Sequence, residues 1–150
     1  MLYLGSDHRG YKVKADIEKY LKSRKVAFVD VGDKKLKPGD DYPDYSKKVA
    51  AAVSKDPAKN SGIVLCGSGQ GVCIVANKYK NVRAVVAWDE AVAVASRHDD
   101  DANVLCLPAD FVSPEMCERI VAKFLNTKFS FEKKHIRRLE EISDIEHGGR

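Results

Sequence analysis

The sequence has no hydrophobic run near the ~20 residues that a membrane-spanning helix requires, so we expect no membrane partner. Its opening stretch, MLYLGSDHRG, turns polar too early for a secretory signal peptide, which leads us to expect a cytoplasmic protein. The four cysteines form no CxxC pair, and this spacing argues against a zinc site and for free thiols in a reducing compartment. No linker, internal repeat or low-complexity segment interrupts the chain, so we expect a single domain over residues 1–150.

The composition is that of an ordinary globular protein. Hydrophobic residues make up 44% of the chain and charged residues 32%, and 150 residues are enough to bury a core. The formal net charge of +4 can help to attract an anionic ligand, but it is too small to indicate a nucleic-acid partner.

Short apolar runs alternate with helical patterns along the whole chain. In residues 12–24, for example, Val13, Ile17, Tyr20 and Leu21 follow the period of one helix face. This alternation predicts parallel β-α-β units and a doubly wound α/β sandwich, with a five-stranded parallel sheet and helices on both faces. We expect strands at residues 1–4, 26–31, 63–66, 82–88 and 103–108, and helices at residues 12–24, 45–55, 72–78, 90–97, 113–126 and 132–146.

The last of these helices is amphipathic. Ile136, Leu139, Ile142 and Ile145 lie on one side of it, among many charged residues. This C-terminal helix is expected to pack on the sheet or to reach onto a partner subunit.

Polar and reactive residues gather in the loops that follow the predicted strands. These loops contain SDHRG, DDYPDY, CGSGQG, WDE and PADF, in chain order. Because an open parallel sheet binds its ligands beyond the carboxyl ends of the strands, we expect the functional site at this edge.

The stretch LCGSGQGV places Cys66 at the end of the third predicted strand, directly before Gly67, Gly69 and Gly71. Glycines allow positive φ and a close approach of the backbone to a ligand. The N-terminus of the following helix favours an anion and promotes thiolate formation in a nearby cysteine. A thiolate beside an array of N–H donors, with the Ser68 hydroxyl in reach, is suited to proton abstraction next to an oxyanion hole.

Two other interpretations of this stretch remain open at this point. Cys66 can be a buried small hydrophobic residue above a tight glycine turn. The loop can also be a variant dinucleotide-binding loop, with Asp89 at the end of the next strand as the ribose-binding acid. Against this second interpretation, the spacing is GxGxG rather than GxGxxG, and the loop follows the third strand rather than the first.

Several motifs occur together in a fixed order: SDHRGYKVK, DYPDY, CGSGQGV, ANK with VRAVVA, and DDDANVL. This ordered set resembles the ribose-5-phosphate isomerase type B family, which also contains galactose-6-phosphate and allose-6-phosphate isomerases, over nearly the whole chain. The resemblance implies a Rossmann-like three-layer α/β/α sandwich and a homodimer, or a tetramer, with active sites shared between subunits. It also implies a reaction without metal or cofactor.

The activity implied is interconversion of ribose 5-phosphate and ribulose 5-phosphate through a cis-enediolate, a step of the pentose phosphate pathway. The alternatives are an isomerase of a six-carbon sugar phosphate and a non-catalytic domain that binds a nucleotide or a sugar phosphate. Under the resemblance, Cys66 is the base and Ser68 stands where the family usually has threonine. The candidate substrate-binding residues are Asp7, His8, Arg9, Tyr42, Gly67, Gly69, Gly71, Asn103, Lys134 and Arg138.

Some of these residues have a simpler interpretation. Asp7 can cap the first helix, and His8 can be a surface residue of its loop. Lys134, Arg137 and Arg138 can form a solvated helix face, the usual role of a run of charges.

The sequence departs from the family pattern at two places. The family commonly has a ring-opening histidine where this chain has Asp99, and the nearest histidine is His98. We therefore expect His98 or Asp99 to provide acid–base catalysis, unless ring opening is left to solution. Many members also have a phosphate-binding arginine where this chain has Asp110, so Arg9 is a candidate replacement.

Overall fold

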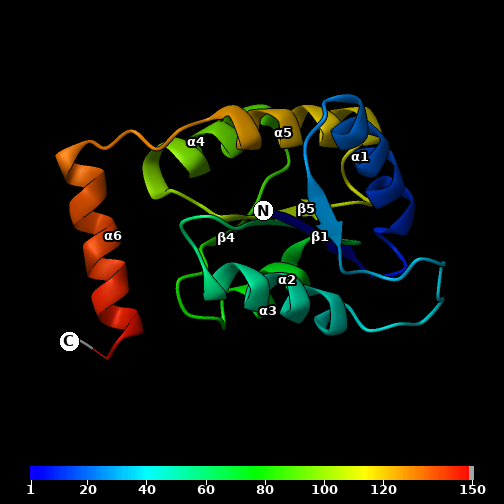
Figure 1. Ribbon diagram of the computed structural model, residues 1–150, viewed down its shortest axis with the longest axis horizontal. Coiled ribbons are helices and arrows are strands. Elements are labelled where there is room, and N and C mark those ends of the chain that lie inside the picture. Colours follow the sequence, from blue (N-terminus) through cyan, green and yellow to red (C-terminus); the bar gives the residue numbers. More distant parts are fainter. Residues whose placement is uncertain (149–150) are drawn as a thin grey trace.

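The computed structural model describes residues 1–148, and these residues form one parallel sheet with the strand order β2-β1-β3-β5-β4 (Figure 1). The strands are β1 (Leu2–Ser6), β2 (Phe28–Asp30), β3 (Ser61–Cys66), β4 (Ala84–Val86) and β5 (Val104–Pro108). The helices are α1 (Tyr11–Ser23), α2 (Pro43–Lys55), α3 (Gln70–Ala76), α4 (Glu90–Asp100), α5 (Pro114–Asn126) and α6 (Lys133–Glu146).

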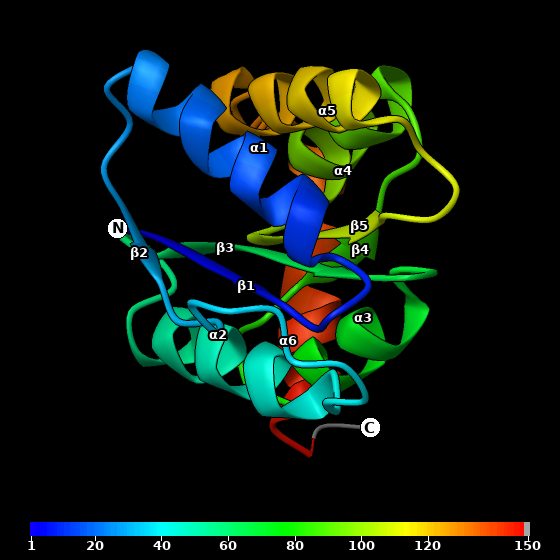
Figure 2. The same ribbon diagram turned by 90° about the vertical axis from the view of Figure 1, so that its right-hand side faces the viewer.

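Helices cover both faces of the sheet, which confirms the predicted three-layer α/β/α sandwich. Helices α1, α4 and α5 lie on one face, and α2 and α3 on the other (Figures 1 and 2). The alternation of strand side chains divides the core accordingly. Leu65 and Leu105 pack in the first layer, whereas Val64, Cys66 and Cys106 pack in the second.

Strand β3 lies at the centre of the sheet, with β1 and β5 as its two neighbours. Ser6 at the end of β1 is aligned with Leu65, and Cys66 is aligned with Pro108 at the end of β5. The strand order reverses direction between β1 and β3, and such a switch point opens a crevice at the carboxyl edge. The loops after β1, β3 and β5 therefore meet around Cys66.

Some element bounds differ from the sequence-based expectation. Helix α2 begins at Pro43, inside the expected loop, because proline suits the first position of a helix. Helix α4 continues to Asp100 and is ended by Asp101 at φ 44°, so His98 and Asp99 lie on the helix itself. Strand β4 is shorter than expected because it is an edge strand that pairs only with β5. Within residues 1–148, no helix is both long and apolar enough to cross a membrane.

Helix α6 stands apart from the sandwich, beyond β4, at the edge of the molecule (Figure 1). Near its C-terminal end, the Glu146 carboxylate accepts the Asn81 amide N–H at 2.8 Å. The side chains of Ile142 and Ile145 are 47% and 74% exposed. The chain therefore leaves part of the apolar face of α6 uncovered.

Candidate active site

Cys66 ends β3 at the centre of the carboxyl edge and is 4% exposed. Its sulfur accepts the backbone N–H of Gly69 at 3.1 Å, a bond that a thiolate accepts more strongly than a thiol does. Within residues 1–148, no hydrogen bond engages the amide N–H of Ser68 or of Gly71. The sulfur therefore lies beside backbone donors that are free to bind an anion.

The three glycines of the loop serve different purposes. Only Gly69 has a positive φ, 73°, so the expectation of positive φ for Gly67 and Gly71 is wrong. Gly67 is required because a Cβ atom there would lie 2.5 Å from Arg9 Cζ. Gly71 is required because a Cβ atom there would lie 2.6 Å from the ring of Tyr42. The glycines thus admit two side chains, Arg9 and Tyr42, against the loop.

Ser68 is exposed at the tip of the loop, and its hydroxyl oxygen accepts the Gln70 amide N–H at 3.3 Å. The hydroxyl hydrogen remains available for a ligand. Ser68 thus lies two residues from the buried Cys66 on an exposed part of the loop, and its role beside the sulfur stays a prediction.

Asp7 organises the loop between β1 and α1. One carboxylate oxygen accepts the amide N–H groups of Arg9 and Gly10, at 2.9 and 3.0 Å. These bonds order the loop before α1 but do not cap that helix, whose N-cap residue is Gly10 without a side-chain cap, so the interpretation of Asp7 as a helix cap is wrong. The second carboxylate oxygen of Asp7 has no hydrogen bond within residues 1–148. Burial raises the pKa of Asp7, and the two amide hydrogen bonds oppose that rise.

His8 is held by an acidic network that the sequence did not reveal. Asp40 accepts both the backbone N–H and Nδ1 of His8, at 2.8 and 2.7 Å. The Tyr45 hydroxyl lies 2.7 Å from Asp40 and 2.8 Å from Asp33. The hydrogen bond to Asp40 raises the pKa of His8 above its usual value. His8 thus retains its positive charge to a higher pH, as a phosphate-binding residue would.

Asp40 remains an anion in this network. Burial would raise its pKa, but hydrogen bonds from Tyr45 and His8 outweigh burial and lower it. Burial and the two nearby carboxylates raise the pKa of Tyr45, so its hydroxyl stays protonated and can donate. The sequence signal for this network is a tyrosine near the start of a helix that follows an acid-rich loop.

Arg9 forms an ion pair with Asp110, across the carboxyl end of β3. The side chains are 58% and 33% exposed, and both lie against Gly67. Asp110 is fixed by its own backbone N–H, which donates to the Gly67 carbonyl at 3.0 Å. The acid that departs from the family pattern is therefore matched by a neighbouring cation, although the two residues are 101 positions apart.

The remaining candidates do not lie near Cys66 within one chain. Helix α4 runs back from the carboxyl edge, so His98 and Asp99 lie at its far end, and Lys134 and Arg138 lie on α6. Asn103 precedes β5, at the amino edge, and its carbonyl accepts the Gly62 N–H at 2.9 Å. A single chain therefore does not bring these residues together with Cys66.

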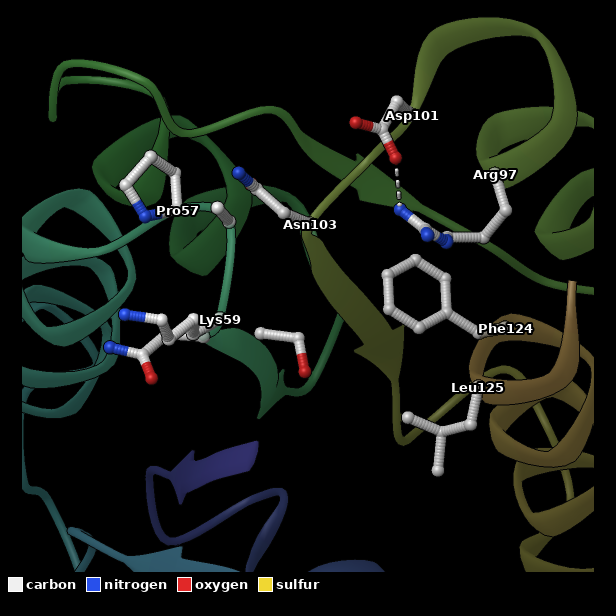
Figure 3. A pocket seen from close by; sticks show the side chains of 10 residues that line it. Pro57, Lys59, Arg97, Asp101, Asn103, Phe124 and Leu125 are labelled. Carbon is white, nitrogen blue, oxygen red and sulfur yellow. Dashed lines mark hydrogen bonds and ion pairs between the residues drawn. The ribbon is translucent and has the colours of Figure 1, made fainter. Parts of the chain in front are cut away.

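Asn103 is 5% exposed and ties two neighbouring backbone groups together. Its Oδ1 accepts the Arg83 N–H and its Nδ2 donates to the Asn81 carbonyl, both at 2.8 Å. One N–H and one lone pair of the amide remain free. Figure 3 shows it beside a hollow of about 250 Å³ at this edge, where Arg97 pairs with Asp101.

The Asp89 side chain has a structural role at the start of helix α4. Its carboxylate accepts the Val92 N–H at 2.8 Å and caps helix α4. An acid that caps its own helix is not available as a ribose ligand, which argues against the dinucleotide interpretation. The four cysteines are all free thiols, as expected.

The geometry defines a parallel α/β protein with a cysteine and a row of free amides at the switch point of its sheet. The model of the ribose/galactose isomerase family matches residues 2–142, so the chain belongs to this family and is an isomerase. This membership excludes the non-catalytic binding domain.

Individual relatives are similar over almost their whole length. The chain is 40% identical to the probable ribose-5-phosphate isomerase B of Mycoplasma pneumoniae, over 94% of this chain and 91% of that protein. It is 36% identical to the ribose-5-phosphate isomerase B of Escherichia coli, over 95% and 93%. The crystal structure of ribose-5-phosphate isomerase B from Mycoplasma genitalium, with bound ribulose-5-phosphate, is 39% identical, covers 97% and 95% of the two chains, and has a TM-score of 0.94.

Proposed function

We propose that the chain interconverts ribose 5-phosphate and ribulose 5-phosphate, with Cys66 as the base. The observation that carries this proposal is the Cys66 sulfur, which lies at the switch point and accepts the Gly69 N–H at 3.1 Å. The names of the relatives and the ribulose-5-phosphate bound in the Mycoplasma genitalium structure support the choice of substrate.

In the proposed reaction, the Cys66 thiolate removes the proton from C2 of the open-chain aldose. The C2–H electron pair forms the C1–C2 double bond, and the C1 carbonyl oxygen takes the negative charge as a cis-enediolate. The free amides of Ser68 and Gly71 and the Ser68 hydroxyl stabilise that oxygen. The hydroxyl proton of O2 passes to O1, and Cys66 returns its proton to C1 from the same face.

We propose that the site is completed by a second copy of the chain. His8 and Arg9 supply positive charge from the subunit that holds Cys66, and Lys134 and Arg138 supply it from helix α6 of the other subunit. The exposed apolar side chains of α6, Ile142 and Ile145, support a homodimer because they need a cover. Tyr42 and the free oxygen of Asp7 are placed to hold sugar hydroxyls.

The second copy would also supply the ring-opening group. His98 Nδ1 lies 2.7 Å from Asp99 Oδ1. The hydrogen bond from His98 lowers the pKa of Asp99, so Asp99 is a carboxylate that can orient and charge the imidazole. We propose that His98 donates a proton to the ring oxygen and that Asp99 orients His98. Asn103 would bind the sugar through its free N–H.

The base is tested by following hydrogen exchange at C2 by NMR, together with a coupled isomerase assay, in Cys66→Ala. Loss of a general base is expected to reduce the rate by about 10²–10⁴-fold. Cys73→Ser is the matched control, because Cys73 lies on the neighbouring helix and its thiol contacts the Ala84 carbonyl. Full exchange activity in Cys66→Ala would show that another group removes the proton.

The shared site is tested by mixing two inactive variants, Cys66→Ala and Arg138→Ala. A mixed dimer has one site with both residues intact, so roughly one quarter of the wild-type activity should return in an equal mixture. No recovery in a mixture that forms mixed dimers would contradict a site shared between subunits.

The six-carbon alternative is tested by assaying ribose 5-phosphate, allose 6-phosphate and galactose 6-phosphate as substrates under matched conditions. A higher kcat/KM for a hexose phosphate than for ribose 5-phosphate would replace the proposed substrate but keep the mechanism.

We also propose a cytoplasmic location, because free thiols such as Cys66 are typical of a reducing compartment.

A further inference from the structure

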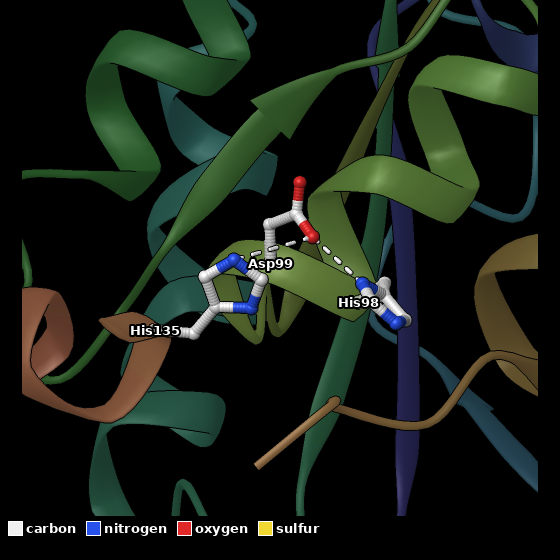
Figure 4. Close-up of side chains that lie close together, drawn as sticks. All are labelled: His98, Asp99 and His135. Carbon is white, nitrogen blue, oxygen red and sulfur yellow. Dashed lines mark hydrogen bonds and ion pairs between the residues drawn. The ribbon is translucent and has the colours of Figure 1, made fainter. Parts of the chain in front are cut away.

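Three metal-ligating side chains meet where the end of α4 faces the start of α6 (Figure 4). His98, Asp99 and His135 each direct one ligand atom inward, and these atoms all lie within 4.8 Å of one another. Asp99 Oδ1 lies between the two imidazoles, 2.7 Å from His98 Nδ1 and 3.7 Å from His135 Nε2. Ligands of a tetrahedral zinc ion are separated by roughly 3.3 Å, so small movements suffice to coordinate one.

His135 supplies an independent indication of a ligand. It is 4% exposed, and its Nδ1 lies 2.7 Å from Ser130 Oγ. Its Nε2 has no hydrogen-bond partner within residues 1–148, because the 3.7 Å to Asp99 exceeds hydrogen-bond range. This nitrogen faces a carboxylate oxygen, so two atoms that can each ligate a metal converge on one point. A cation between the two would supply the partner.

Ser130 acts as the outer contact that metal-ligating histidines usually have. Its hydroxyl oxygen already accepts the Glu132 amide N–H at 3.2 Å and can also accept from Nδ1–H of His135. That arrangement leaves the Nε2 lone pair facing Asp99. The Ser130 amide N–H donates to the His98 carbonyl at 3.0 Å, which fixes the serine against the end of α4.

The surroundings suit a divalent ion with nitrogen ligands. Asp99 supplies a carboxylate oxygen between two imidazole rings. The neighbouring Lys134 pairs with the Glu132 carboxylate at 3.0 Å. Two imidazoles and one carboxylate favour zinc, copper or nickel over magnesium or calcium. His98 and Asp99 are about half exposed, so water can complete the coordination.

We propose that His98, Asp99 and His135 bind a divalent transition-metal cation of the zinc class. The bound ion ties α4 to α6 through ligands of a single chain. It also breaks the hydrogen bond between His98 and Asp99, the pair to which ring opening is assigned, so it inhibits isomerisation. This inhibitory effect rests on the proposed function, whereas the binding itself does not.

The test is a Zn²⁺ titration of the chelator-treated full-length protein, in competition with a chromophoric chelator and without substrate. We expect one ion per chain, and a four- or five-coordinate absorption spectrum when Co²⁺ replaces Zn²⁺. His135→Gln and the more exposed His98→Gln should each weaken binding by more than about tenfold, and Ser130→Ala by about tenfold. His147→Gln, at the exposed end of α6, is the control and should bind as the wild type does.

Retention of full affinity in His98→Gln, with its fold verified by circular dichroism, would overturn the metal site. Equal loss in His147→Gln, or binding no tighter than that of Mg²⁺, would also overturn it. If Zn²⁺ binds with the expected ligands but leaves isomerisation unchanged, the metal site stands and the ring-opening assignment fails. The two hypotheses are therefore distinguished by separate measurements.

Discussion

Replacement of Gly67 by alanine should impair phosphate binding without unfolding the protein. A Cβ atom at this position would lie 2.5 Å from Arg9 Cζ and 2.6 Å from Asp110 Oδ2, so neither side chain can stay in place. Both contacts are the ends of flexible side chains, 58% and 33% exposed, which can move without the backbone. The ion pair is partly exposed and contributes about 0–1 kcal/mol to stability, so the melting temperature should hardly change.

The kinetic effect should be much larger. If Arg9 donates to the substrate phosphate, its displacement removes one charge-assisted hydrogen bond, worth about 1.5–3 kcal/mol. That free energy corresponds to a decrease of about 10- to 150-fold in kcat/KM, carried mainly by KM. The assay is the coupled isomerisation of ribose 5-phosphate, with thermal unfolding followed on the same samples. Gly148→Ala is the control for KM, because a Cβ atom at Gly148 meets nothing within 4 Å and leaves Arg9 in place, although its φ of 82° is expected to cost some stability.

Gly69→Ala should behave differently, and the contrast tests the reasoning. A Cβ atom there would meet backbone, 3.1 Å from Pro108 N and 3.2 Å from Leu107 C, at a φ of 73°. Backbone cannot swing aside, and the left-handed conformation costs a non-glycine residue about 1–2 kcal/mol. Gly69→Ala should therefore lower the stability of the protein. It should also lower kcat, because the residue 69 N–H that donates to the Cys66 sulfur would be displaced. If Gly67→Ala is destabilised as much as Gly69→Ala, or keeps the wild-type KM, the role given to Arg9 is wrong.

Three further outcomes follow from named contacts. Lys14→Met should destabilise the protein by about 1–3 kcal/mol in urea unfolding, because the buried Asp30 carboxylate loses its partner at 2.6 Å and keeps only Lys34 at 3.0 Å and the Gly32 N–H. The exposed Lys19→Met should cost less than about 1 kcal/mol. Asp40→Asn removes the bond that raises the pKa of His8, so the decline of kcat/KM with rising pH should begin at lower pH. Ile142→Asp should shift the mass measured by light scattering from dimer towards monomer; an unchanged dimer would exclude this face.

The layers and the carboxyl-edge site were predictable because they depend on local patterns. Apolar runs and helical periods occur within a few residues of one another, and the parallel topology then determines which loops meet. Cys66, at the end of β3, followed from this alone. The start of α2 and the end of α4 were harder to predict, because each depends on a single residue: Pro43 begins α2, and Asp101 in the left-handed conformation ends α4.

The contacts that position the site were not predictable, because they join distant segments. Asp40 and His8 are 32 residues apart, and their pairing depends on a loop whose path the sequence does not specify. Tyr45 looked like an ordinary helix residue, yet its hydroxyl reaches two carboxylates. The glycine pattern predicted that some group lies close to the loop, but it did not identify that group. Only the fold shows that the side chains of Arg9 and Tyr42 lie against these glycines.

The pairing of Arg9 with Asp110 concerns the position of an arginine. Many family members have this arginine in the loop after β5, where this chain has Asp110, and this chain has Arg9 in the loop after β1. The loops after β1 and β5 leave the sheet on either side of β3, so both reach the backbone of Gly67. A cation delivered from either loop therefore arrives at the same point beside the cysteine. Asp110 accepts one N–H of the Arg9 guanidinium, and within residues 1–148 no hydrogen bond engages the other guanidinium N–H groups of Arg9, which can donate to an anion. The sheet order, rather than the identity of the loop, fixes where positive charge is available, and the proposed chemistry at Cys66 requires only that.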